Sequence, residues 1–151
     1  MTLVPSDVEA RVKNACDRFT TQDSKLLDFD ASERSMTHKL AEYLQQEFPG
    51  WDVDCEYNRD IQKPKSMPWE GCSHLPYKRR RILPDIVIHK RGSDENLIVI
   101  EAKKSNNRNK SNHDSCKMKV YKSLLGYRFG YFVTFPIGKG TSSSLDVTEF
   151  S

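Results

Sequence analysis

Two apolar runs separated by a turn constrain the fold of this chain most. Residues 82–90 and 97–103 are rich in isoleucine, valine and leucine, and Gly-Ser-Asp-Glu-Asn stands between them at 92–96. Aliphatic runs of this length around a glycine-containing turn are typical of a β-hairpin. We therefore predict two neighbouring antiparallel strands in the middle of the sequence.

Charged residues stand at one end of this predicted hairpin. Side chains alternate along a strand, so Glu101 and Lys103 share a face, and Asp85 of the partner strand lies opposite them. Two carboxylates at the end of an apolar strand are costly to desolvate, and they repel each other unless a cation neutralises them. Mg²⁺ is suited to such a pair, and a nearby ammonium group suits phosphodiester hydrolysis. The alternative is a surface ion pair at two strand ends.

The flanking sequence predicts a mixed α/β fold with a small central sheet flanked by helices. Helical spacing of apolar residues and alternation in strands define the other elements. These are helices over residues 6–19 and 32–48, a strand over 51–58, a helix over 114–125 and a strand over 127–135. Because the last helix connects two strands, we expect one parallel pair in an otherwise antiparallel sheet.

The 151 residues are expected to form a single domain with its core at about 30–135. Residues 20–31 are polar and are expected to connect the first two helices. Residues 59–84 are expected to form a long loop that is either functional or mobile, and the Gly/Ser/Thr-rich residues 136–151 a weakly ordered tail. Without a membrane-length apolar run or a secretory pattern, we expect a cytoplasmic protein that does not bind membranes.

The charged hairpin end resembles a known family. Pro84-Asp85 followed by Glu101-Ala102-Lys103 is similar to the signature of the PD-(D/E)xK nuclease superfamily, which has the restriction-endonuclease-like fold. The resemblance covers about residues 30–135. It implies that Asp85 and Glu101 bind Mg²⁺, with Mn²⁺ as a substitute, and that Lys103 orients the attacking water and stabilises the transition state.

Glu33 is the candidate for a further acidic residue. In this superfamily such a residue often comes from the first core helix, and Glu33 stands near the start of the helix predicted over 32–48. The resemblance therefore implies that it supports the metal, directly or through water. The alternative is a capping role, with Asp30 as the N-cap of that helix.

Charge is segregated along the sequence. Residues 58–81 hold seven basic and two acidic residues, as do residues 101–122, whereas residues 1–57 have a net charge of −6. If the two basic blocks meet, they suit a polyanion; otherwise they are solvated loops. The candidate phosphate contacts are Arg59, Arg79, Arg80, Arg81, Lys119 and Lys122.

The sequence thus predicts a magnesium-dependent nuclease of a defence or repair pathway, and the resemblance favours DNA over RNA as its substrate. Specificity would come from the loop at 59–83, from a protein partner or from a homodimer. One alternative is a catalytically silent nucleic-acid-binding or assembly module on the same fold, although the intact set of Asp85, Glu101 and Lys103 argues against it. Another is a toxin- or immunity-type interaction protein, whose acidic first third would bind a partner.

Overall fold

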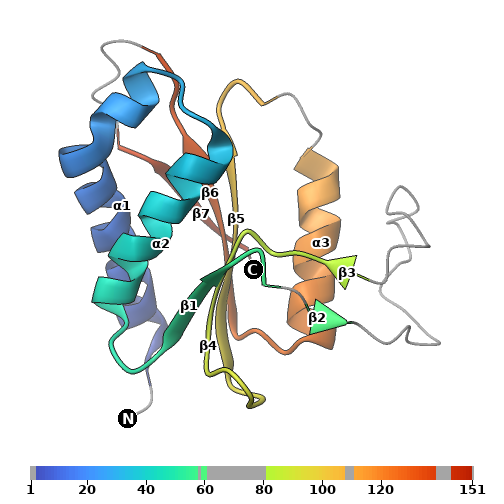
Figure 1. The fold of residues 1–151 in the computed structure, drawn as a ribbon. Helices are drawn as coiled ribbons and strands as arrows, with labels where there is room; N and C mark the ends of the chain where they lie inside the picture. The colour runs from blue at the N-terminus through green and yellow to red at the C-terminus, as the bar shows by residue number, and fades with distance from the viewer. Residues whose placement is uncertain (1–2, 58, 61–80, 108–110, 139–143, 151) are drawn as a thin grey trace.

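A five-stranded mixed sheet with the strand order β1-β4-β5-β6-β7 lies at the centre of the protein (Figure 1). The computed structural model describes residues 3–57, 59–60, 81–107, 111–138 and 144–150. Its elements are α1 (Pro5–Asp28), α2 (Glu33–Glu47), β1 (Asp52–Cys55), β2 (Arg59–Asp60), β3 (Arg81–Ile82), β4 (Ile86–His89), β5 (Asn96–Lys104), α3 (Ser111–Leu124), β6 (Phe129–Phe135) and β7 (Asp146–Phe150). The expected α/β fold with a small mixed sheet is confirmed at this level.

The predicted hairpin is formed by β4 and β5, which pair antiparallel with Ile86 opposite Ile100. From β5 the chain crosses through α3 to β6, and β5 and β6 are parallel. The other strand pairs in this sheet, β1 with β4 and β6 with β7, are antiparallel. The expected single parallel pair is therefore confirmed, because a helical crossover is what returns the chain in the same direction.

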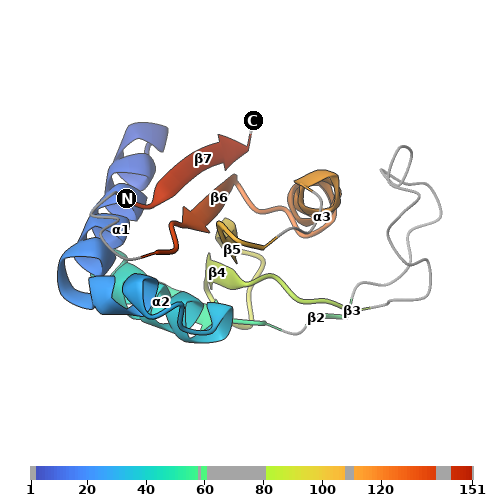
Figure 2. The same cartoon turned by 90° about the horizontal axis from the view of Figure 1, so that it is seen from above.

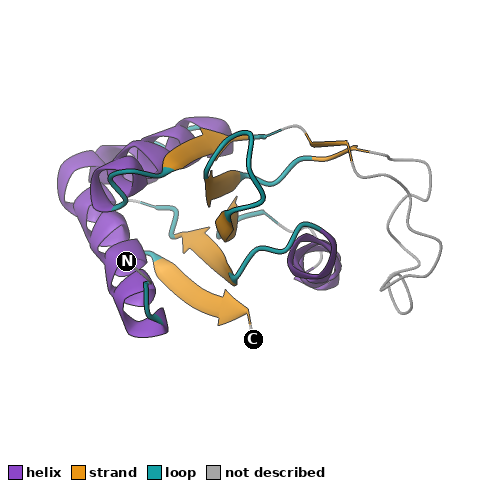
Figure 3. Cartoon of the chain, turned by 90° about the horizontal axis from the view of Figure 1, so that it is seen from below, coloured by secondary structure: helices purple, strands orange, loops and turns teal. Residues whose placement is uncertain are grey.

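The two faces of the sheet are covered unequally. Helices α1 and α2 lie against one face and α3 lies against the other (Figures 2 and 3). Ile98 and Ile100 of β5 belong to the large core cluster with α1 and α2, whereas Val99 belongs to a smaller cluster with α3. By the same alternation, Glu101 and Lys103 emerge on the side of α3.

The first helix is longer than the sequence predicted. α1 continues through the expected connection at 20–31 as far as Asp28, with a non-helical backbone at Asp23. Leu27 explains the extension, because its side chain is fully buried in the main core. The polar residues before it form the solvent-facing side of a continuing helix, since neither glycine nor proline interrupts this segment.

The second helix begins at Glu33, as expected within one residue. Its N-cap is Ser32, whose hydroxyl accepts a hydrogen bond from the Ser35 backbone N–H. Asp30 is therefore not the cap, and its backbone has a positive φ of 51°. Glu33 occupies the first helical position, so its carboxylate is not needed for a capping box.

The C-terminal prediction was wrong. Within the segment at 136–151, β7 pairs antiparallel with β6, from Gly130 opposite Phe150 to Thr134 opposite Asp146. The edge of β6 provides backbone partners that the sequence pattern alone cannot show. The strand expected over 51–58 is also shorter, since β1 ends at Cys55 and Glu56 has a φ of 49°.

None of the described helices combines the length and apolarity needed to cross a membrane. The acidic first third of the sequence accounts for α1 and α2, while the described lysines of the second basic block lie on β5 and α3. Basic and acidic segments thus belong largely to opposite layers of the fold.

Candidate active site

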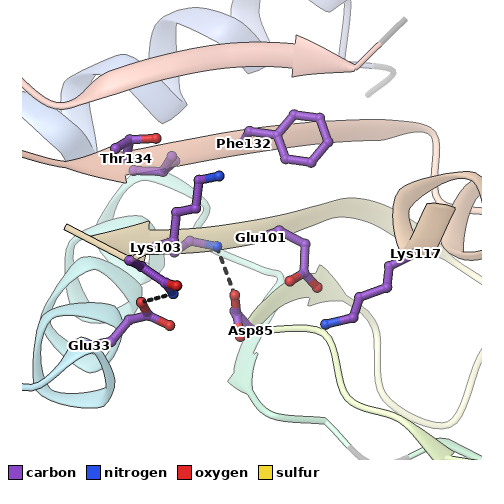
Figure 4. Close-up of a pocket in the computed structure, with 10 residues that line it drawn as sticks. Glu33, Asp85, Glu101, Lys103, Lys117, Phe132 and Thr134 are labelled. Carbon is purple, nitrogen blue, oxygen red and sulfur yellow. Dashed lines mark hydrogen bonds between the residues drawn. The ribbon is translucent and has the colours of Figure 1, made fainter. Parts of the chain in front are cut away.

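A pocket lies on the α3 side of the sheet, where β5 ends. It has a volume of about 120 Å³ and collects residues from five segments of the chain. It is lined by Glu33, Asp85, Glu101, Ala102, Lys103, Asn107, Lys117, Phe132, Val133 and Thr134. All four residues expected to act in catalysis, namely Glu33, Asp85, Glu101 and Lys103, are among them (Figure 4).

Asp85 stands directly before β4, and the hairpin places it beside the end of β5. Its carboxylate accepts a hydrogen bond of 2.8 Å from the Ala102 backbone N–H. The predicted position of Asp85 opposite residues 101–103 is therefore confirmed. Burial raises the pKa of Asp85, while the hydrogen bond from Ala102 and the positive charge of Lys117 act in the opposite direction.

Glu101 is the most deeply buried carboxylate of the pocket, with 6% of its surface exposed. Among the residues that the structure describes, its Oε1 atom has no hydrogen-bond partner. Burial raises the pKa of Glu101 well above its ordinary value, and the negative charge of Asp85 raises it further. A buried carboxylate in this setting favours either a proton or a cation.

Glu33 reaches the pocket from the opposite layer. It lies on α2, on the other face of the sheet, and its Oε2 accepts hydrogen bonds of 3.1 Å from the Lys104 N–H and from the Asn107 side chain. These bonds tie the start of α2 to the chain leaving β5. Glu33 therefore lines the same pocket as Asp85 and Glu101, but its carboxylate is engaged by two donors, and the three acidic side chains are not grouped as a metal site within the described residues.

Two lysines line the pocket, and only one was selected from the sequence. Lys103 lies on β5 as predicted, whereas Lys117 comes from α3 and points toward Asp85 and Glu101 (Figure 4). The pKa values of Asp85 and Glu101 are both raised, and the positive charge of Lys117 offsets part of that rise. Its position four residues before Tyr121, which is fully buried, could have revealed that it faces the sheet.

Of the other basic candidates, the two described on α3 do not line this pocket. Lys119 is exposed on α3, and Lys122 donates a hydrogen bond of 3.3 Å to the carbonyl oxygen of Phe150. Arg59 and Arg81 lie in the β2–β3 pair, but their side chains are outside the description. The remaining two candidates, Arg79 and Arg80, lie outside the described residues.

Asp85 and Glu101 could together supply two ligands to a divalent cation, but they do not form a complete set of protein ligands. Within the described ranges, no three His, Cys, Asp or Glu side chains are grouped to hold a metal ion. Mg²⁺ needs only one or two carboxylates, because it retains water and takes substrate phosphate oxygens. Asp85 and Glu101 satisfy that requirement, and the buried Oε1 of Glu101 supplies a ligand atom that no described protein group uses.

Searches with family models, curated proteins and solved structures find no match for this chain. Its chemistry must therefore be inferred from the pocket and from the sequence resemblance. The pocket combines a buried acid, Glu101, and a partly buried acid, Asp85, with two lysines on one side of a sheet. Such a combination can bind a cation and an anionic group together.

Proposed function

We propose that this protein is a magnesium-dependent nuclease of the PD-(D/E)xK type, with a restriction-endonuclease-like fold and DNA as its substrate. The observation that carries the proposal is that Asp85, Glu101 and Lys103 line one pocket, in which a buried oxygen of Glu101 has no hydrogen-bond partner among the described residues. A surface ion pair at two strand ends would not need that burial. The order of helices and strands from α2 to β6 is also the order that the resemblance implies.

Each residue of the pocket has a distinct role in this proposal. Asp85 and Glu101 hold the cation, which when bound supplies Lewis-acid activation of water and neutralises charge at the phosphate. The Lys103 ammonium group orients the attacking water and stabilises the charge that develops on the phosphate. Lys117 binds a non-bridging phosphate oxygen from the side of α3.

Glu33 acts on the shape of the pocket. Because it binds the Lys104 N–H and the Asn107 side chain, it fixes the backbone just beyond Lys103. We propose that this contact sets the direction of the Lys103 side chain. A water-mediated contact to the cation remains consistent with its place in the pocket lining.

Nucleic-acid binding follows from the charge around the pocket. Lys103 and Lys117 line the pocket, and both belong to the basic block at residues 101–122. Phosphate neutralisation by such residues releases counterions, so we propose binding that weakens steeply with salt. The block at 58–81, which leads toward Asp85, would extend the contact.

The test is a cleavage assay on plasmid DNA, single-stranded DNA and RNA, each with Mg²⁺, Mn²⁺ or EDTA. Asp85→Asn, Glu101→Gln and Lys103→Ala are expected to reduce cleavage at least 100-fold, since each removes a group that acts on the reacting atoms. Exposed charges provide the matched controls Glu95→Gln and Lys13→Ala, with 61% and 56% of their side chains accessible. These controls should cut like the parent protein.

Two results would contradict the proposal. The first is the absence of metal-dependent cleavage on all three substrates, and the second is full cleavage by Asp85→Asn and Lys103→Ala. Salt-sensitive binding without cleavage in any metal would instead favour the catalytically silent nucleic-acid-binding module. Isothermal titration with Mn²⁺ then separates the cases, because a binding module has no need for cation affinity that depends on Asp85.

A further inference from the structure

An aromatic side chain, Phe132, forms one wall of the otherwise polar pocket. It lies on β6 directly beside Glu101 in the parallel register of β5 and β6. Figure 4 shows the ring next to Glu101, on the side of the pocket away from Asp85. The ring is only partly buried. Phe132 packs in part against the small core cluster on the α3 side. Neither that packing nor the binding of a cation and a phosphate accounts for the part of the ring that stays exposed at the pocket.

The Phe132 ring is supported from behind. It meets Phe150 of β7 edge-to-face, with ring centroids 6.0 Å apart and planes at 80°. Lys122 holds Phe150 in turn, since its ammonium group bonds the Phe150 carbonyl oxygen at 3.3 Å and lies 5.7 Å from the ring centroid. A ring held in this way loses little conformational entropy when a ligand stacks on it.

The lining of the pocket divides between polar and aromatic groups. Its acidic and basic side chains suit a cation and one phosphate group, within a volume of about 120 Å³. A nucleobase attached to that phosphate finds an apolar contact only at the aromatic part of the described lining. Phe132 is the aromatic surface that the described lining offers for it.

We propose that Phe132 is a stacking surface for an unpaired base next to the bond that is cut, which makes single-stranded or frayed nucleic acid the preferred substrate. This inference rests on the proposed function. In a duplex each base is covered on both sides by its neighbours, whereas an unpaired base exposes its flat face. Stacking on an aromatic side chain tolerates every base, so it selects for strand state rather than sequence.

The test measures binding of a short mixed-sequence oligodeoxynucleotide by the inactive Asp85→Asn protein in Mg²⁺. Adding Phe132→Leu to this parent should weaken binding of the single strand roughly 10-fold, whereas Phe132→Trp should retain it. A strand of the same length that is abasic throughout should bind the parent more weakly by the same factor. On that strand Phe132→Leu should cause no further loss, because the ring and the bases contribute through one shared contact.

Phe29→Leu is the matched control, since Phe29 is 73% exposed after α1 and does not line the pocket. Thermal melts should show that each variant remains folded. Equal binding by the parent and Phe132→Leu, or tighter parental binding to a blunt duplex than to the single strand, would overturn the inference. If metal-dependent cleavage is nevertheless observed, the proposed nuclease function is retained and only the stacking role of Phe132 is rejected. If base-dependent binding requires Phe132 but no substrate is cut, the stacking role is retained and the proposed nuclease function is rejected.

Discussion

Replacing Glu101 by glutamine should have two effects. It should abolish cleavage, and it should make the metal-free protein more stable. The carboxyl group is almost fully buried, and its pKa is raised by burial and by the charge of Asp85. The folded protein therefore keeps a proton on Glu101 at pH values where the unfolded chain has released it. Glutamine has nearly the same shape, cannot ionise and can donate to the Asp85 carboxylate, so it removes the cost of the buried charge.

The sign and the size of the effect follow from proton linkage. A carboxyl group with a raised pKa in the folded state has no effect on stability below its ordinary pKa of 4.5, and it lowers stability as pH rises above that value. One extra proton on the folded protein gives a slope of about −1.4 kcal/mol per pH unit. The destabilisation grows with this slope until the pH reaches the raised pKa of Glu101 in the folded protein.

Urea unfolding in EDTA, from about pH 5 to about pH 8, measures this slope. Stability of the parent should fall across the range, while that of Glu101→Gln should fall much less and exceed the parent at the upper end. Mg²⁺ at 100 times its Kd should restore about 2.7 kcal/mol to the parent and nothing to the variant. Parallel pH curves for the two proteins, or a variant less stable at every pH, would refute the reasoning. The exposed Glu95→Gln serves as the control.

Three further predictions concern the scaffold. A Cβ added at Gly130 would clash with the sulfur of buried Met118, so Gly130→Ala should cost about 1–3 kcal/mol in urea unfolding, and it should cost less when it is introduced into a Met118→Ala background. Ser32→Ala removes the N-cap of α2 and should cost about 1 kcal/mol in the same assay. The hydrogen bond from Arg91 lowers the pKa of Asp54, so this carboxylate stabilises the fold above its ordinary pKa of 3.8 and loses that effect as pH falls below it. Asp54→Asn should therefore show a shallower loss of stability below about pH 4, followed by acid titration of circular dichroism.

The hairpin and its charged end could be predicted because their determinants are close together in sequence. Aliphatic runs, a turn and the alternation of side chains fix the places of Asp85 and Glu101 with a separation of only sixteen residues. Glu33 required the family resemblance, since it reaches the pocket from another layer. The bond from the Lys104 N–H that holds it spans 71 residues.

Other features depended on contacts that a sequence pattern does not contain. β7 is a short edge strand, and it exists because β6 offers it backbone partners. Lys117 enters the pocket because of the rotation of α3 against the sheet, whereas the sequence favoured Lys119 and Lys122 because these two positions share one face of the helix. Leu27 likewise shows that a polar stretch can be one face of a long helix.

Because the two faces of the sheet are covered unequally, the larger hydrophobic core and the candidate active site lie on opposite faces. Most buried apolar side chains gather on the α1 and α2 side, whereas the pocket occupies the side that a single helix covers. Substitutions around the pocket therefore leave the larger of the two core clusters intact. A lineage, or an engineer, could exchange Phe132, Lys117 or the loop beyond β5 and select a new substrate while the other layer is left untouched.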